Sequence, residues 1–131
     1  MARRKSRTLT ELELEIMRVV WREGDVSVEV LRDALATLGT HLALPSVRTM
    51  LSILQEKGYV ARRRAGRGFL YRAVVPAEQA ERRILKDVIE RVFDGSASNL
   101  VAALVSQGMV GKDDLAEARK IIARQERRDT S

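Results

Sequence analysis

The chain of 131 residues contains no cysteine, one histidine and few aromatic residues. Because cysteine is absent, disulfides and thiolate metal sites are excluded, which agrees with a reducing compartment. The one histidine, His41, has no nearby set of metal ligands or catalytic partners, so we assign it no role. No long apolar run is present, and we therefore expect a cytoplasmic protein without signal peptide, membrane span, metal or cofactor.

The net charge of +6 is unevenly distributed along the chain. Residues 1–75 contain 14 Lys and Arg against 8 Asp and Glu, whereas residues 76–131 contain 10 of each kind. All of the excess positive charge therefore lies in the first part, which is typical of a module that binds a polyanion. We expect a flexible basic arm (1–8), a nucleic-acid-binding domain (9–75) and a second domain (76–131).

Cap residues and apolar spacing predict two helices near the start of the chain. Thr10 and Glu13 form a capping box, and the helix that they begin is expected to stop at Gly24. Ser27 is a suitable N-cap for the next helix, which is expected to end at Gly39. Trp21 lies at helical spacing from other apolar residues, so we expect it in the core.

A third helix is predicted from Pro45 or Ser46 to Lys57, because proline is tolerated in a first turn. Its apolar residues recur at helical spacing, and polar residues occupy the other faces. Residues 59–64 and 69–74 then form two β-prone runs on either side of a glycine-containing turn, which predicts a hairpin. Arg63, Arg64 and Arg67 would lie near its tip.

Three further amphipathic helices are predicted after Pro76. The first ends at Asp94-Gly95, the second is capped by Ser96 or Ser98, and the third runs from about Lys112 to Arg127. This part has no net charge and is too small to bury its apolar helix faces by itself. We therefore expect a second subunit to cover these faces. The expected dimerisation residues are Ile84, Leu85, Val88, Ile89, Val92, Phe93, Leu100, Leu104, Ile121 and Ile122.

Three helices followed by a hairpin are the layout of a winged helix-turn-helix, so the fold class is mainly α with a small β-hairpin. In this layout the third helix enters the major groove of duplex DNA and its first residues meet the base edges. Ser46, Arg48, Thr49 and Ser52 are the expected contacts on this helix, and arginine suits guanine. Arg63, Arg64 and Arg67 would contact phosphates or the minor groove. The alternative for residues 62–64 is a solvated strand edge that its charge protects from aggregation.

Several stretches in combination resemble one known family. They are Leu9–Glu13, Ile16-Met17, Val20-Trp21, Leu42–Leu51, Leu54, Lys57–Val60, Gly66-Arg67, Phe69 and Tyr71, with a looser match at Phe93–Ser96. On these residues the chain resembles the BlaI/MecI/CopY family of winged-helix repressors.

The resemblance implies a homodimer that binds a palindromic operator and blocks transcription, with the last three helices as the dimer interface. It also implies a regulatory protease as a partner, which would cut in the fifth helix at Ala103-Leu104. Relatives that are controlled in this way carry an asparagine–phenylalanine bond there, and this chain does not. Copper-responsive relatives have a cysteine-rich tail, so copper sensing through thiolates is excluded here.

Two other classes of function predict different surface residues from those of a DNA-binding repressor. A winged helix can serve as a protein-binding module without DNA specificity, since fold does not fix function. Such a module should expose apolar residues on its third helix and wing, whereas this one offers arginine, serine and threonine. An enzyme would need a convergent set of acids, bases or metal ligands. The carboxylates lie at spacings typical of solvated helix faces, so we expect no enzymatic activity.

Overall fold

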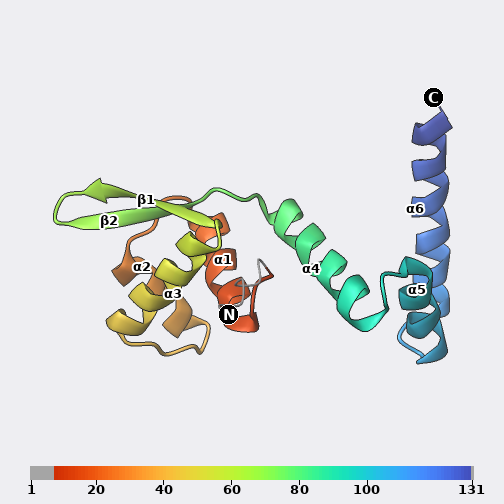
Figure 1. Cartoon of the computed structure of the whole chain (residues 1–131), viewed down its shortest axis with the longest axis horizontal. Coiled ribbons are helices and arrows are strands. Elements are labelled where there is room, and N and C mark those ends of the chain that lie inside the picture. The colour runs from red at the N-terminus through yellow and green to blue at the C-terminus, as the bar shows by residue number, and fades with distance from the viewer. Residues whose placement is uncertain (1–7, 131) are drawn as a thin grey trace, which may run out of the picture. The chain divides into compact units, whose positions relative to one another are not determined.

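The computed structural model describes residues 8–130, and it confirms the predicted class of a mainly α fold with one small hairpin (Figure 1). The elements in chain order are α1 (Glu11–Glu23), α2 (Val28–Thr37), α3 (Leu44–Glu56), β1 (Val60–Ala65), β2 (Gly68–Ala73), α4 (Ala77–Val92), α5 (Ala97–Ser106) and α6 (Lys112–Thr130). The basic arm predicted over residues 1–8 lies outside the described residues, apart from Thr8.

The predicted caps of α1 and α2 are present. The hydroxyl of Thr10 accepts a hydrogen bond from the backbone N–H of Glu13, and the Glu13 carboxylate accepts one from the N–H of Thr10. Ser27 accepts a hydrogen bond from the N–H of Val30 at the start of α2. These bonds satisfy N–H groups that have no partner within a helix, and so they fix where each helix begins.

The ends of α3 and α6 differ from the predicted ones. Helix α3 begins at Leu44 and ends at Glu56 instead of running from Pro45 or Ser46 to Lys57. Pro45 is at the second helical position, where its missing N–H would also be unpaired, so it does not mark the first residue. Helix α6 continues to Thr130, past the predicted end near Arg127, since no glycine or proline follows to stop it.

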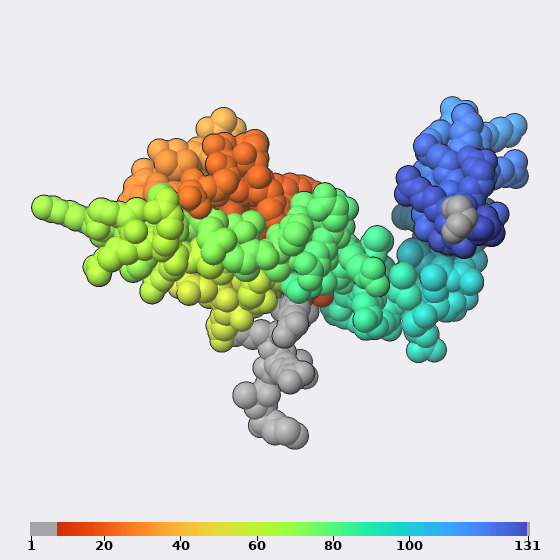
Figure 2. Space-filling model, turned by 90° about the horizontal axis from the view of Figure 1, so that it is seen from above, coloured from red at the N-terminus to blue at the C-terminus, as the bar shows by residue number. Residues whose placement is uncertain are grey.

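Strands β1 and β2 pair in the predicted antiparallel hairpin, with Arg62 opposite Tyr71 and Arg64 opposite Phe69. The two residues between the strands are Gly66 and Arg67, and Gly66 has a φ of 60°. A two-residue turn with positive φ at its first position follows the right-handed twist of the strands and favours glycine there. Figure 2 shows the hairpin standing out from the remainder of the N-terminal part.

A short third strand segment was missed by the sequence analysis. Val26, in the connection between α1 and α2, forms an antiparallel bridge with Tyr71 of β2. The two residues exchange backbone hydrogen bonds of 2.9 and 2.8 Å. This bridge attaches the base of the hairpin to the start of α2, so the wing is anchored to the helix-turn-helix.

One hydrophobic core lies among α1, α2, α3 and the base of the hairpin. Its fully buried side chains include Ile16, Met17, Leu31, Leu35, Val47, Leu51, Leu54 and Tyr59. Trp21 packs against this core as predicted, and its indole N–H donates to the carbonyl of Val75 at 2.9 Å. The place of Trp21 beside the core agrees with its helical spacing, whereas Leu38, which has the same spacing at the C-terminal end of α2, is exposed.

Two compact units are present, and the division falls inside α4, between Asp87 and Val88. Ala80 is fully buried, and the guanidinium of Arg83 lies 5.2 Å from the ring centre of Tyr59. The beginning of α4 thus belongs to the first unit. The domain boundary at residue 75 stays a prediction. In residues 8–130 we find no helix with the length and apolarity that crossing a bilayer requires.

Candidate nucleic-acid interface

Helix α3 has one buried and one exposed face. Val47, Leu51 and Leu54 are fully buried in the core. The predicted contact residues Ser46, Arg48, Thr49 and Ser52 are all exposed. The structure therefore places these four polar side chains where a partner can reach them, with the apolar residues of the same helix fixing its orientation.

The hydroxyl of Thr49 has a restricted role. It donates a hydrogen bond of 3.0 Å to the carbonyl of Pro45, one turn earlier in α3. This is the common backbonding arrangement of threonine in a helix. Its hydroxyl hydrogen is therefore engaged within the helix, which leaves the methyl group and an acceptor oxygen for a partner, and these suit a thymine methyl or an amino group of a base.

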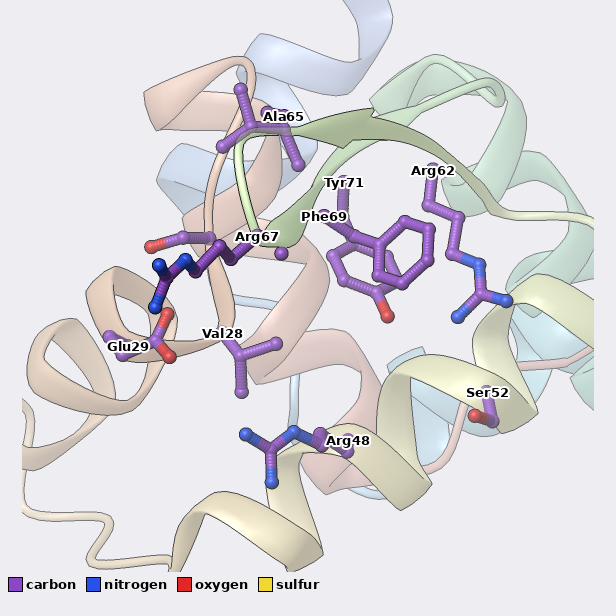
Figure 3. A pocket seen from close by; sticks show the side chains of 12 residues that line it. Val28, Glu29, Arg48, Ser52, Arg62, Ala65, Arg67, Phe69 and Tyr71 are labelled. Carbon is purple, nitrogen blue, oxygen red and sulfur yellow. The ribbon is translucent and has the colours of Figure 1, made fainter.

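A hollow of about 610 Å³ lies between α3, the start of α2 and the hairpin (Figure 3). Arg48 and Ser52 line it from α3, and Arg62 and Arg67 line it from the hairpin. Three arginines around one hollow create a positive potential, which attracts an anion such as a phosphate group.

Residues at the start of α2 also line this hollow. Ser27 caps the helix, and Glu29 contributes the only carboxylate among the lining residues. Figure 3 shows the Arg67 side chain extending from the turn toward Glu29. The carboxylate lowers the positive potential of the hollow, because it is an opposite charge close to the arginines.

The three consecutive arginines of β1 do not share one environment. The guanidinium carbon of Arg62 is 4.1 Å from the ring centre of Phe69, and that of Arg64 is 6.0 Å from the same centre. Arg63 forms an ion pair with Asp25, with 3.2 Å between its Nη2 and the carboxylate. Because side chains alternate along a strand, Arg63 lies on the opposite face from its two neighbours.

Arg62 was not among the predicted contact residues, although it lines the hollow. The sequence did contain a signal that could have found it. Period-two alternation along β1 places Arg62 on the same face as the buried Val60, whereas Arg63 lies on the other face. Ser27 and Glu29 were also missed, because their place in the hollow depends on how α2 packs beside the hairpin.

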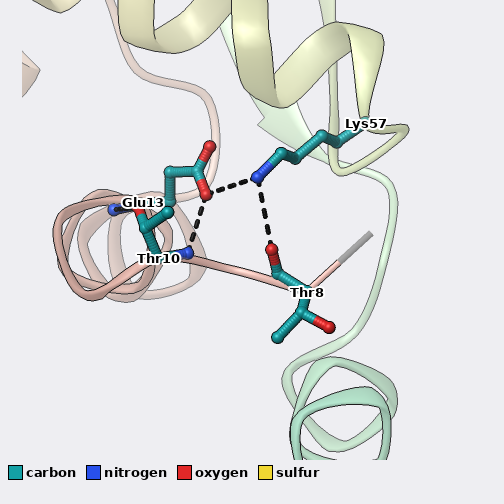
Figure 4. A network of polar contacts seen from close by, with 4 residues as sticks. All are labelled: Thr8, Thr10, Glu13 and Lys57. Carbon is teal, nitrogen blue, oxygen red and sulfur yellow. Dashed lines mark hydrogen bonds and ion pairs between the residues drawn. The ribbon is translucent and has the colours of Figure 1, made fainter. Parts of the chain in front are cut away.

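A buried polar network connects the start of α1 to the end of α3 (Figure 4). The ammonium of Lys57 lies 2.7 Å from the Glu13 carboxylate and donates to the carbonyl of Thr8 at 3.2 Å. The side chains of Lys57 and Glu13 are only 9% and 3% exposed. This ion pair joins the two helices at a fixed point, so it helps to set the position of α3.

The charged form of Glu13 is favoured in this network. Burial by itself raises the pKa of the carboxyl, but the hydrogen bonds from Lys57 and Thr10 outweigh it, and the pKa lies below its ordinary value. Glu13 is therefore ionised at neutral pH and Lys57 keeps its counterion.

Most of the predicted dimerisation residues lie in the second unit, whereas Ile84 and Leu85 precede its first residue, Val88. Ile84, Leu85, Val88, Ile89 and Val92 lie on α4, Phe93 follows it, Leu100 and Leu104 lie on α5, and Ile121 and Ile122 lie on α6. Beyond Ala80 no described residue is buried. Val92, Ile121 and Ile122 are 68%, 53% and 56% exposed. These apolar side chains are therefore largely accessible to solvent, and their role in dimerisation stays a prediction.

Ala103 and Leu104, the cleavage position implied by the resemblance, are half-buried within α5. Over residues 8–130 no group of three or more histidine, aspartate and glutamate side chains is arranged to hold a metal ion.

The three-helix core, the bridged hairpin and the polar face of α3 together define a winged-helix protein. Sequence comparison then identifies the family: the chain belongs to the penicillinase repressor family, whose model matches residues 9–124. Members of this family are transcriptional repressors, so the chain is a DNA-binding repressor of the BlaI/MecI type and not an enzyme. The predicted family is thereby confirmed.

Individual relatives are distant in sequence. The methicillin resistance regulatory protein MecI of Staphylococcus aureus (strain N315) is 22% identical over 118 residues, which cover 90% of this chain and 95% of MecI. An uncharacterised 16.5 kDa protein of Latilactobacillus sakei is 26% identical over 114 residues, 87% of this chain and 77% of that protein.

Solved structures agree on the fold. The DNA-binding domain of the repressor BlaI superposes with a TM-score of 0.50 at 25% identity, covering 59% of this chain and 93% of that domain. A chain of the hsRosR-SG complex gives a TM-score of 0.51 at 15% identity, covering 94% of this chain and 96% of that one. The second likeness concerns the fold alone.

Proposed function

We propose that the protein represses transcription as a homodimer bound to a palindromic operator in duplex DNA, in the cytoplasm. The observation that carries this proposal is the exposed polar face of α3 beside a hollow lined by Arg48, Arg62 and Arg67. Such a face matches a major groove, into which one helix fits, with phosphates on either side. Repression follows because a bound dimer occupies the DNA that transcription requires.

The base sequence of the operator would be recognised by four residues of α3, namely Ser46, Arg48, Thr49 and Ser52. Arg48 is the residue of this set that can donate two hydrogen bonds to a guanine, so we assign it the largest share of the specificity. Arginines of the hairpin, among them Arg64 and Arg67, would supply contacts to the phosphate backbone. Phosphate contacts set the position of the protein on DNA without reading its sequence.

Dimerisation through the second unit is supported by its exposed apolar side chains. We expect the full chain to sediment as a dimer and a fragment ending at Asp87 as a monomer that binds operator DNA weakly. The cut after Asp87 keeps Ala80 and Arg83, which pack on the first unit. A dimeric fragment would place the interface in the first unit instead.

Release by a regulatory protease at Ala103-Leu104 remains a prediction from the resemblance. Both residues lie inside α5, so a protease would have to open this helix before cutting it. Incubation of the chain with a membrane fraction from induced cells, followed by mass spectrometry of the products, tests this. An intact chain with lost DNA binding would instead point to release by a ligand.

The decisive experiment is a selection from random duplex DNA by the full chain. The expected result is a palindrome whose half-sites are about 34–36 Å apart, one helical turn. Binding should also weaken steeply with salt, because each neutralised phosphate contributes a slope of about −0.9 in log K against log salt concentration. If no motif is enriched and the salt response is flat, the protein is a winged-helix module that binds another protein.

A further inference from the structure

The aromatic ring of Phe69, in the hairpin that forms the wing, contacts two guanidinium groups. Phe69 lies opposite Arg64 in the hairpin register, and Arg62 lies opposite Tyr71, the residue two positions further along β2. All four side chains are therefore on one face of the hairpin. The guanidinium of Arg62 covers the Phe69 ring at 4.1 Å, whereas that of Arg64 reaches its margin at 6.0 Å.

This face is the one that borders the hollow. Arg62 and Phe69 line it together with Arg48 and Ser52 of α3, and Figure 3 shows Arg62 and Phe69 beside one another there. No carboxylate of residues 8–130 pairs with Arg62. Arg63 differs, since it is on the other face and its charge is already compensated by Asp25.

Stacking prepares an arginine for binding a phosphate. A planar guanidinium that packs its flat face on a ring leaves the N–H groups at its edge free for two parallel hydrogen bonds to an anion. A side chain held in this way loses less conformational freedom when it binds. Lysine cannot reproduce the arrangement, because its ammonium is neither planar nor forked.

We propose that Arg62 is the main phosphate-binding arginine of the wing, that Phe69 positions it, and that Arg63 does not contact DNA. The ligand is a backbone phosphate of the operator that enters the hollow between α3 and the hairpin. This inference rests on the proposed function, and it goes further by choosing among three adjacent arginines of β1 on the basis of their observed contacts.

Arg62→Ala and Arg63→Ala are matched variants, because they remove the same charge from adjacent exposed positions of one strand. Both are titrated, as full-length protein, against the duplex recovered by the selection, between 0.05 and 0.3 M salt. For Arg62→Ala we expect a loss of about fivefold at 0.15 M salt and a slope that is smaller by about 1.8, because each of the two subunits loses one phosphate contact and each contact contributes about 0.9. For Arg63→Ala we expect less than a twofold change and an unaltered slope.

The positioning role of Phe69 has its own test. Phe69→Leu keeps an apolar side chain at this position but removes the ring, so it should weaken operator binding in the wild-type background. In an Arg62→Ala background most of that loss should disappear, because the two residues act on the same contact. Arg62→Lys should retain most of the salt slope and still bind more weakly than the wild type.

The outcomes separate this inference from the function on which it rests. If the wild-type chain selects no operator, the proposed function fails and the inference falls with it. If the wild type binds but Arg63→Ala loses as much as Arg62→Ala, or if neither loses any, the assignment of Arg62 is wrong. If Phe69→Leu causes the same loss with and without Arg62, the ring has a structural role only. Thermal unfolding of each variant verifies that it is folded.

Discussion

The pair formed by Glu13 and Lys57 permits a sharp test of what holds α3 in place. Glu13→Gln has nearly the same shape but no charge, so it leaves the Lys57 ammonium in a site where this side chain is 9% exposed. Breaking a buried ion pair by neutralising one partner typically costs about 3–5 kcal/mol. We expect the lower end, about 3 kcal/mol, because the carbonyl of Thr8 remains as an acceptor at 3.2 Å.

Thermal and urea unfolding followed by circular dichroism measures this loss. In a domain of this size each kcal/mol shifts Tm by about 4–8 °C, so a fall of more than about 10 °C is expected. Glu23→Gln is the matched control, since the Arg22–Glu23 pair is exposed at 57% and 42%, and it should change the stability by less than about 1 kcal/mol. Glu13→Gln with stability close to that of Glu23→Gln would refute the reasoning.

The pH dependence provides a second reading of the same pair. The pKa of Glu13 in the folded state lies below its ordinary value of 4.5, so its contribution to stability is complete above about that pH. It is lost as the pH falls through the folded pKa. The stability difference between wild type and Glu13→Gln should therefore be constant near neutral pH and shrink below about pH 4. A difference that grows on acidification would contradict the lowered pKa.

Three further predictions concern the interface and the core. Arg48→Ala should cost about 1–3 kcal/mol on the selected operator and broaden the motif, whereas Arg67→Ala should weaken all sequences alike; an unchanged motif for Arg48→Ala would mean that another residue reads the base. Glu29→Gln should raise DNA affinity about twofold, because it removes the one carboxylate of the hollow, and lower affinity in a filter-binding titration would contradict this. Leu51→Ala, at a fully buried position of α3, should destabilise by about 2–5 kcal/mol in urea unfolding, and a change below 1 kcal/mol would contradict the packing.

Local patterns were sufficient for most of the fold. The capping box of Thr10 and Glu13 is made by residues three positions apart, so the sequence contains both partners and the start of α1 could be predicted. Helical spacing separated Val47 and Leu51 from the polar residues of α3 in the same way. The end of α6 was predicted too early, because the apolar period fades before Thr130 and the polar residues that follow are still compatible with a helix.

Many of the residues at the proposed interface could also be predicted from the sequence. The charge imbalance and the order of helices and hairpin indicated a DNA-binding winged helix, and the polar residues of α3 were assigned to the exposed face on which they lie. Strand alternation places Arg62 and Arg64 on one face of the hairpin and Arg63 on the other. The sequence did not indicate which of these faces would border α3. Asp25 is distant in the sequence from Arg63, and only folding brings the two together.

The sequence by itself determined the class of protein, the helices, the hairpin and the core, because each depends on the spacing and type of residues that are close along the chain. Only the tertiary structure decided which groups meet across elements: Lys57 with Glu13, Val26 with Tyr71, and Arg62 with the hollow beside α3. The physical reason is that these contacts join segments separated by many residues. Their formation depends on how the whole core packs, which no local pattern records.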